Sequence, residues 1–125
     1  MANKRRPYRT VRVDSFEVLI GRSDEQNDWL TFEVADPHDF WLHVAGGVAG
    51  SHVVIRNPQR LAKLPRPVIK RAAALAAWYS KARQAGKVEV HVCRVADVSK
   101  PRGMPPGTVL LERWMRVRIA PGGVD

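Results

Sequence analysis

The residues of this sequence that could do chemistry are concentrated between positions 39 and 56, in the stretch DFWLHVAGGVAGSHVVIR. Asp39, His43 and His52 are of the types that bind metal ions, so one interpretation is a metal-dependent hydrolase. The stretch contains no compact ligand motif such as HExxH, so its spacing is weak support for a metal site. Ser51 and His52 are adjacent, and adjacent strand residues point to opposite faces, which disfavours a nucleophile–base pair.

The same stretch can instead form a binding surface. Trp41 and His43 offer flat rings, and Ser51 and His52 can donate hydrogen bonds to phosphate. RNA recognition combines aromatic rings that stack on bases with basic side chains that bind phosphates. Core packing is the competing interpretation for Trp41.

The charge of the chain is high and unevenly distributed. The net charge is +9 and the isoelectric point is about 10.6. Residues 13–48 carry eight acidic side chains and one basic one, whereas residues 49–118 carry fifteen basic and three acidic side chains. Such segregation predicts a basic face, and a basic face binds polyanions. Nucleic acid is the polyanion that a small basic domain usually meets.

Length and composition predict one globular domain over residues 11–119, flanked by a flexible basic arm at 1–10 and a frayed tail at 120–125. Cys93 is the only cysteine, which excludes an intrachain disulfide and a cysteine-based zinc site. No apolar run approaches the ~18 residues of a membrane span, and no apolar segment follows the basic N-terminus as in a signal peptide. We therefore expect a cytoplasmic protein without a membrane partner.

The periodicity of the apolar residues predicts an α+β fold. An alanine-rich pattern between a proline and a glycine predicts a long helix over residues 68–86, and Ser23 is typical of the cap of a shorter helix over 23–35. Trp29 and Trp78 lie in these helices and are interpreted as core residues. We expect a mainly antiparallel sheet of about five or six strands packed against the long helix. The predicted strands are 11–21, which holds one or two, 40–44, 52–55 and 88–95, with a closing hairpin of 108–111 and 114–119.

The order of several short motifs resembles the NFACT-R family of domains. The matching motifs are Gly21-Arg22, Asn27-Asp28, Asp39-Phe40-Trp41-Leu42-His43 and Gly50-Ser51-His52-Val53-Val54-Ile55, then AAALAAWYSKAR from Ala72, GKVEVHV from Gly86 and SKPRGMPPGTVLLE from Ser99. The resemblance covers about residues 14–119, and the blocks DxWxH and GSHVVI are specific when they occur together. The chain departs from the family at Ala49, where members often have proline, and near Ala45, where they often have a basic residue.

The resemblance implies an RNA-binding domain. NFACT-R is the RNA-binding part of larger proteins of ribosome-associated quality control, which bind a stalled large ribosomal subunit that carries peptidyl-tRNA. The further domains of those proteins do not fit into 125 residues, so the chain resembles a stand-alone version. We therefore expect a non-enzymatic protein without a cofactor that binds structured RNA, either tRNA or ribosomal RNA. The resemblance also makes the large ribosomal subunit an expected partner.

The residues expected at the RNA interface come from the central motifs and from later basic segments. Asp39 is expected to orient His43 or Arg22 rather than to touch RNA. Three alternatives stay open: a DNA-binding module, the hydrolase described above, and a protein-interaction module that uses the acidic region 14–39. The expected interface residues are Arg22, Asp39, Trp41, His43, Ser51, His52, Arg56, Lys81, Arg83, Lys100 and Arg102.

Overall fold

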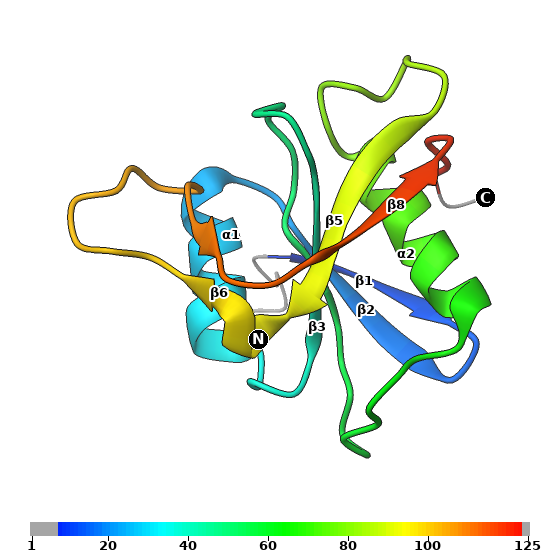
Figure 1. Cartoon of the computed structure of the whole chain (residues 1–125), viewed down its shortest axis with the longest axis horizontal. Helices are drawn as coiled ribbons and strands as arrows, with labels where there is room; N and C mark the ends of the chain where they lie inside the picture. The colour runs from blue at the N-terminus through cyan, green and yellow to red at the C-terminus, as the bar shows by residue number, and fades with distance from the viewer. Residues whose placement is uncertain (1–7, 124–125) are drawn as a thin grey trace, which may run out of the picture.

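The fold is built on one six-stranded sheet. The computed structural model describes residues 8–123. Within them the sheet has the strand order β1-β2-β4-β3-β5-β8, every neighbouring pair is antiparallel, and β6 and β7 form a separate ribbon (Figure 1). The predicted α+β class and antiparallel sheet are confirmed. The strands are β1 (Tyr8–Val13), β2 (Phe16–Gly21), β3 (Phe40–Val44), β4 (Val53–Ile55), β5 (Val88–Arg94), β6 (Val98–Ser99), β7 (Leu110–Leu111) and β8 (Met115–Ile119).

Helix α2 (Arg66–Trp78) covers one face of the sheet. The side chains that it buries are mostly alanines, whose small size allows the helix to pack closely against the strands. Leu42 and Val92 lie opposite it in the same core, and neither side chain is more than 1% exposed. The buried alanines are Ala72, Ala73, Ala76 and Ala77.

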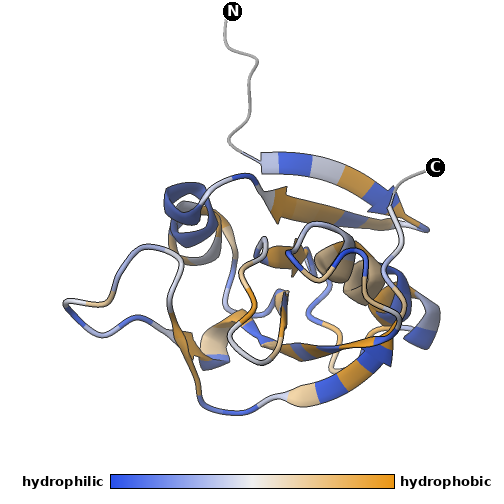
Figure 2. Ribbon diagram, turned by 90° about the horizontal axis from the view of Figure 1, so that it is seen from above, coloured by the Kyte–Doolittle hydropathy of each residue, from blue (hydrophilic) through white to orange (hydrophobic). Residues whose placement is uncertain are grey.

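The other face of the sheet is covered by shorter elements. These are helix α1 (Asp24–Trp29), the π-helical turn Leu30–Val34, the 3-10 turn Val95–Asp97 and the β6–β7 ribbon. Strands β2, β3 and β4 are therefore buried on both sides along most of their length, so their sequences are mostly apolar rather than alternating. Figure 2 shows this contrast between the mainly hydrophobic β2 and the alternating edge strand β1.

The long helix is shorter than predicted. The expected helix over 68–86 begins at Arg66 but ends at Trp78, after 13 residues. Beyond this point the chain pairs with the glycine-rich segment instead of continuing the helix. The Ser51 N–H donates to the Tyr79 carbonyl and the Lys81 N–H donates to the Ala49 carbonyl, both at 2.9 Å. These backbone hydrogen bonds to a distant segment end the helix, although the sequence after Trp78 is still of a helical type.

The shorter helix begins where its cap predicts. The Gln26 N–H donates to Ser23 Oγ at 3.2 Å, as expected of an N-cap. After Trp29 the backbone widens into the π-helical turn, which buries Leu30 and Thr31. The assignment of Trp29 to the core is wrong, because its side chain is 45% exposed. Trp78, also predicted for the core, is only partly buried.

The last strands do not form the predicted closing hairpin. β7 pairs with β6, whereas β8 pairs with β5 at the edge of the main sheet. The two predicted hairpin strands therefore belong to different sheets. Figure 1 shows the long loop between β6 and β7 extending away from the body of the molecule.

The chain ends are more ordered than the sequence predicted. Residues 8–10 of the expected arm belong to β1, and residues 1–7 lie outside the described part. The tail packs on α2, because the Arg71 guanidinium donates to the carbonyls of Gly122 and Gly123 and the Gly122 N–H donates to Ala74. Residues 124–125 are not described. In the described chain neither helix is long and apolar enough to cross a membrane.

The close contact between α2 and the sheet predicts a sensitivity to added volume. Ala76→Leu should lower the free energy of unfolding by about 1–3 kcal/mol, because the fully buried site has no room for three further carbons. Urea unfolding at neutral pH measures the change. The control Ala85→Leu, at an exposed position in the following turn, should change stability little. Equal effects of the two substitutions would contradict the close packing.

Candidate nucleic-acid interface

Four basic side chains line one groove next to the end of α2. Arg9 comes from β1, Arg22 follows β2, and Lys81 and Arg83 follow α2. The groove has a volume of about 380 Å³ and is bordered by Ser51. We call it the basic groove. The fold therefore brings together four of the predicted interface residues, which are Arg22, Ser51, Lys81 and Arg83. It adds Arg9, which the sequence pattern placed in the flexible arm.

Aromatic rings support two of the groove arginines. The Arg9 guanidinium carbon lies 4.8 Å from the centre of the Tyr79 ring, and the Arg83 guanidinium carbon lies 3.9 Å from the centre of the Trp78 ring. Such cation–π contacts hold the guanidinium groups in place while leaving their N–H groups able to bind anions. Arg9 could have been found from sequence, because it continues the alternation of Val11 and Val13 along β1.

The ion pairs of the described residues lie outside the basic groove. Asp28 and Asp39 pair with cations elsewhere, and Asp24 is the single acid among the residues that line the groove. The groove cations thus stay available to an anion from solution. The ion pairs are Arg56–Asp39, Lys100–Asp28 and Arg116–Glu89, and His91 Nε2 lies 3.5 Å from Glu89 Oε2.

The glycine-rich turn at residues 45–50 separates the basic groove from a second cavity. Gly46 and Gly47 have φ angles of 77° and 73°, a backbone conformation that favours glycine. Gly50 is required by close contact, because a Cβ there would lie 2.7 Å from the Cβ of Ser80. The turn is therefore held against the end of α2, where it borders both cavities.

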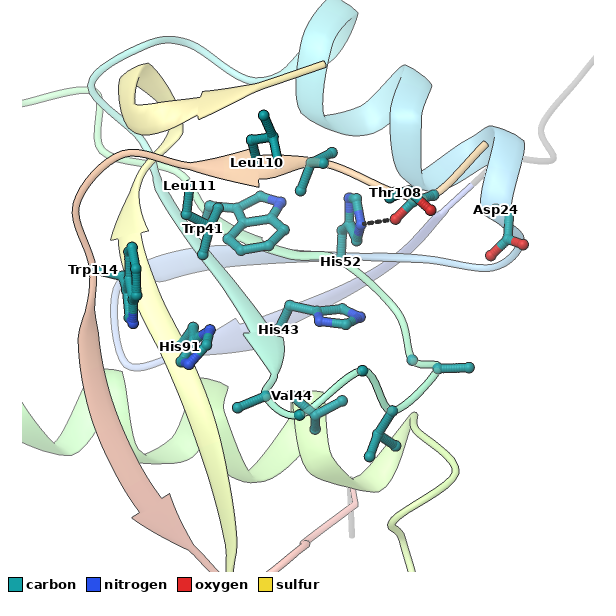
Figure 3. A pocket seen from close by; sticks show the side chains of 18 of the residues that line it. Asp24, Trp41, His43, Val44, His52, His91, Thr108, Leu110, Leu111 and Trp114 are labelled. Carbon is teal, nitrogen blue, oxygen red and sulfur yellow. Dashed lines mark hydrogen bonds between the residues drawn. The ribbon is translucent and has the colours of Figure 1, made fainter. Parts of the chain in front are cut away.

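Five aromatic rings line the second cavity, which has a volume of about 510 Å³. Figure 3 shows these rings, from Trp41, His43, His52, His91 and Trp114, gathered beside the segment that carries β7. The rings of Trp41 and His43 are stacked with centroids 5.8 Å apart, and those of His91 and Trp114 are 5.5 Å apart. We call this cavity the aromatic pocket. It has neither lysine nor arginine among its lining residues, unlike the basic groove.

A chain of buried hydrogen bonds fixes the ring of His52. The Gly107 carbonyl can only accept, so the His52 Nε2, 3.2 Å away, carries the proton (Figure 3). Nδ1 then accepts from the Thr31 hydroxyl at 2.9 Å, and the same hydroxyl accepts from Trp41 Nε1 at 3.2 Å. Burial, assisted by the charge of His43, lowers the pKa of His52 to about 4. The ring is therefore neutral at pH 7, as the network requires.

This network changes the roles predicted for three residues. His52 is 1% exposed and uses both ring nitrogens internally, so it cannot donate to phosphate as expected. Trp41 is buried as well, which confirms the core interpretation. His43 stays partly exposed in the aromatic pocket. Burial lowers the pKa of His43 although the carbonyls of Val44 and Gly50 oppose this, so its ring is mainly neutral at pH 7.

Asp39 is a structural carboxylate. It is 1% exposed and accepts hydrogen bonds from two backbone N–H groups at 2.7 and 2.9 Å. Its Oδ2 lies 2.9 Å from Nε of Arg56, so Asp39 orients that arginine. The expected partners were His43 and Arg22. Asp39 precedes β3, whereas His43 lies near the other end of that strand. Arg22 is also remote, because the start of β2 aligns with the start of β3 and Arg22 follows the end of β2.

The metal-site interpretation fails because its three candidate ligands are not placed around one point. Nowhere in residues 8–123 are three His, Cys, Asp or Glu side chains placed to hold a metal ion. Asp39 and His43 are separated by four residues of extended chain, about 13 Å. His52 has no ring nitrogen left for a ligand bond. The three residues of the hydrolase alternative therefore do not form a site.

The two predicted phosphate contacts in the loop between β6 and β7 differ from each other. Lys100 Nζ donates to the carbonyls of Pro105 and Thr108 and lies 3.2 Å from Asp28 Oδ2. These contacts show that Lys100 stabilises its own loop. Residues 106–108 of that loop form part of the wall of the aromatic pocket. Arg102 is exposed further along the loop and lines neither cavity. Its role as a phosphate contact stays a prediction.

A basic groove beside an aromatic pocket is typical of nucleic-acid-binding domains. The sequence matches the family described as NFACT protein RNA binding domain over residues 6–113. The chain therefore belongs to this family, as its motifs predicted. Its fold is also that of a solved structure, the C-terminal part of the fibronectin/fibrinogen-binding protein from Streptococcus suis. The TM-score is 0.84 at 33% identity, over 97% of this chain and 47% of that one.

Curated relatives resemble the chain over nearly its whole length. The Rqc2 homolog RqcH of Bacillus subtilis is 34% identical over 124 residues, which cover 94% of this chain and 21% of that protein. The Rqc2 homolog RqcH of Streptococcus suis is 35% identical over 120 residues, with the same coverage. The chain thus spans about a fifth of the length of the curated relatives it matches.

The neutral His52 predicts a specific loss of stability in acid. Its pKa is about 4 in the folded protein and about 6.5 when unfolded, so its contribution is complete above pH 6.5 and is lost as the pH falls toward 4. We expect this group to account for about 2 kcal/mol of unfolding free energy lost between about pH 7 and pH 4.5. Urea unfolding at both pH values measures the loss.

His52→Gln should reduce that pH dependence, although it also lowers stability at pH 7. The matched control is His38→Gln, which removes a histidine outside the network and should leave the pH dependence intact. An unchanged pH dependence in His52→Gln would show that the ring is not held neutral by burial.

Proposed function

We propose that this chain is a non-enzymatic domain that binds structured RNA by placing backbone phosphates in the basic groove. The observation that carries the proposal is the convergence of four cations, from three segments distant in sequence, on one groove whose cations form no ion pair within the described chain. Phosphate contacts of this kind supply most of the affinity of a protein for nucleic acid. Ser51 adds a hydroxyl at the groove edge.

RNA rather than DNA is the proposed ligand. The family description and the aromatic rings beside the cations both support RNA, since unpaired RNA bases stack on aromatic side chains. The resemblance to the RNA-binding part of ribosome-associated quality control proteins supports tRNA or ribosomal RNA as the target and the large ribosomal subunit as a partner. Competition between RNA and DNA of equal length and sequence tests the choice. Equal competition would contradict a preference for RNA.

Binding through the groove predicts a steep dependence on salt. With four phosphates neutralised, the plot of log binding constant against log salt concentration should have a slope of about −3. Arg22→Ala combined with Lys81→Ala should reduce this slope by about half, because two of the four contacts are lost. Fluorescence anisotropy with a labelled tRNA, repeated at several salt concentrations, measures both slopes.

The control for this experiment removes the same charge elsewhere. Arg116 and Arg118 are exposed on β8 and line neither cavity. Replacing both with alanine should leave the slope close to that of the original protein. If the two double variants lower the slope equally, the RNA contacts are spread over the surface and the groove proposal fails.

A further inference from the structure

The geometry points to the aromatic pocket as a binding site for one unpaired RNA base, whose neighbouring phosphates occupy the basic groove. This inference rests on the proposed function and adds what the second cavity recognises. It also explains why a basic domain keeps a ring-lined cavity without lysine or arginine beside its phosphate site.

The contrast in charge between the two cavities indicates different ligands. The basic groove has four cationic side chains, whereas the aromatic pocket has neither lysine nor arginine among its lining residues. A phosphate needs cationic or N–H donors, so it is favoured in the groove and disfavoured in the pocket. A planar, uncharged group with two aromatic faces suits the pocket, because the rings of His43 and His52 are neutral at pH 7.

The size and the exposed rings of the pocket fit a nucleobase. Its volume of about 510 Å³ is within the range of about 300–1,000 Å³ typical of small-ligand sites. Trp114 is 45% exposed and lies beside His91, so part of its ring surface can receive a base. His43 lies opposite His91 on the neighbouring strand and extends the ring-lined floor toward the glycine-rich turn. Bases that leave a stack are bound by such side chains.

The two cavities are connected through shared walls. Ala49, Gly50 and Asp24 line both of them, so a nucleic-acid chain in the groove passes next to the pocket. Asp24 adds a carboxylate at this border. A carboxylate repels phosphate but accepts hydrogen bonds from the amino groups of bases. The border therefore favours a base over a phosphate at the point where the chain leaves the groove.

A comparison of normal and abasic RNA tests this assignment. The probes are a labelled single-stranded RNA of mixed sequence and the same ribose-phosphate chain with abasic sites throughout. Trp114→Ala should weaken binding of the normal RNA about tenfold and leave binding of the abasic chain unchanged. Trp29→Ala is the matched control, because its side chain is equally exposed but lines neither cavity. His91→Ala is a second pocket variant, in case Trp114→Ala fails to fold.

The outcomes separate this inference from the proposed function. Salt-sensitive binding in which Trp114→Ala and His91→Ala weaken neither RNA, or weaken both equally, would overturn the base site and leave the groove intact. Absence of binding to every RNA would overturn both. Adenosine monophosphate is titrated as a further arm. If it binds as tightly as the normal RNA, the pocket serves a free nucleotide and not a base of an RNA chain.

Discussion

The buried hydrogen bonds that join Trp41, Thr31 and His52 to Gly107 hold together four segments that are distant in sequence. These segments are β3, the π-helical turn, the residue before β4 and the loop that precedes β7. A buried polar group that loses its partner costs about 1–3 kcal/mol, so no one segment can shift without a penalty in the others. Since Trp41, His52 and Gly107 line the aromatic pocket, the shape of the pocket is set before any ligand arrives.

The side chain of Asn27 links the hydrogen bonds beside the aromatic pocket to the wall of the basic groove. Its Oδ1 accepts from the backbone N–H of His52 at 3.1 Å, and its amide donates to the Gly50 carbonyl at 3.5 Å. The side chain lies directly over Gly21, where any Cβ would collide with it. Ser51 Oγ completes the contact by donating to the Gly21 carbonyl at 2.6 Å. The motifs that include Gly21, Asn27 and Gly50 are thus one packed unit that fixes the wall between the cavities.

Local signals were sufficient for most strands and for the start of α1, because alternation along β5 and the Ser23 cap act within a few residues. The end of α2 could not be predicted, since the helical pattern continues past Trp78 and only pairing with a segment thirty residues earlier stops it. The site shows the same limit. Lys81 and Lys100 lie in similar basic segments, yet one lines the groove while the other is bound to Asp28 and two loop carbonyls.

Burial and charge divide the work between the two cavities. Burial keeps His43 and His52 neutral at pH 7, so these two rings add nothing to the positive field of the groove. In the proposed binding mode, phosphate contacts in the groove release counterions and weaken as salt rises, whereas stacking of a base on the pocket rings does not. In this mode the groove alone holds any polyanion at low salt. The proposed mode therefore implies that the pocket supplies a larger share of the binding free energy as salt rises. Discrimination among RNAs by an unpaired base is then greatest where total affinity is lower.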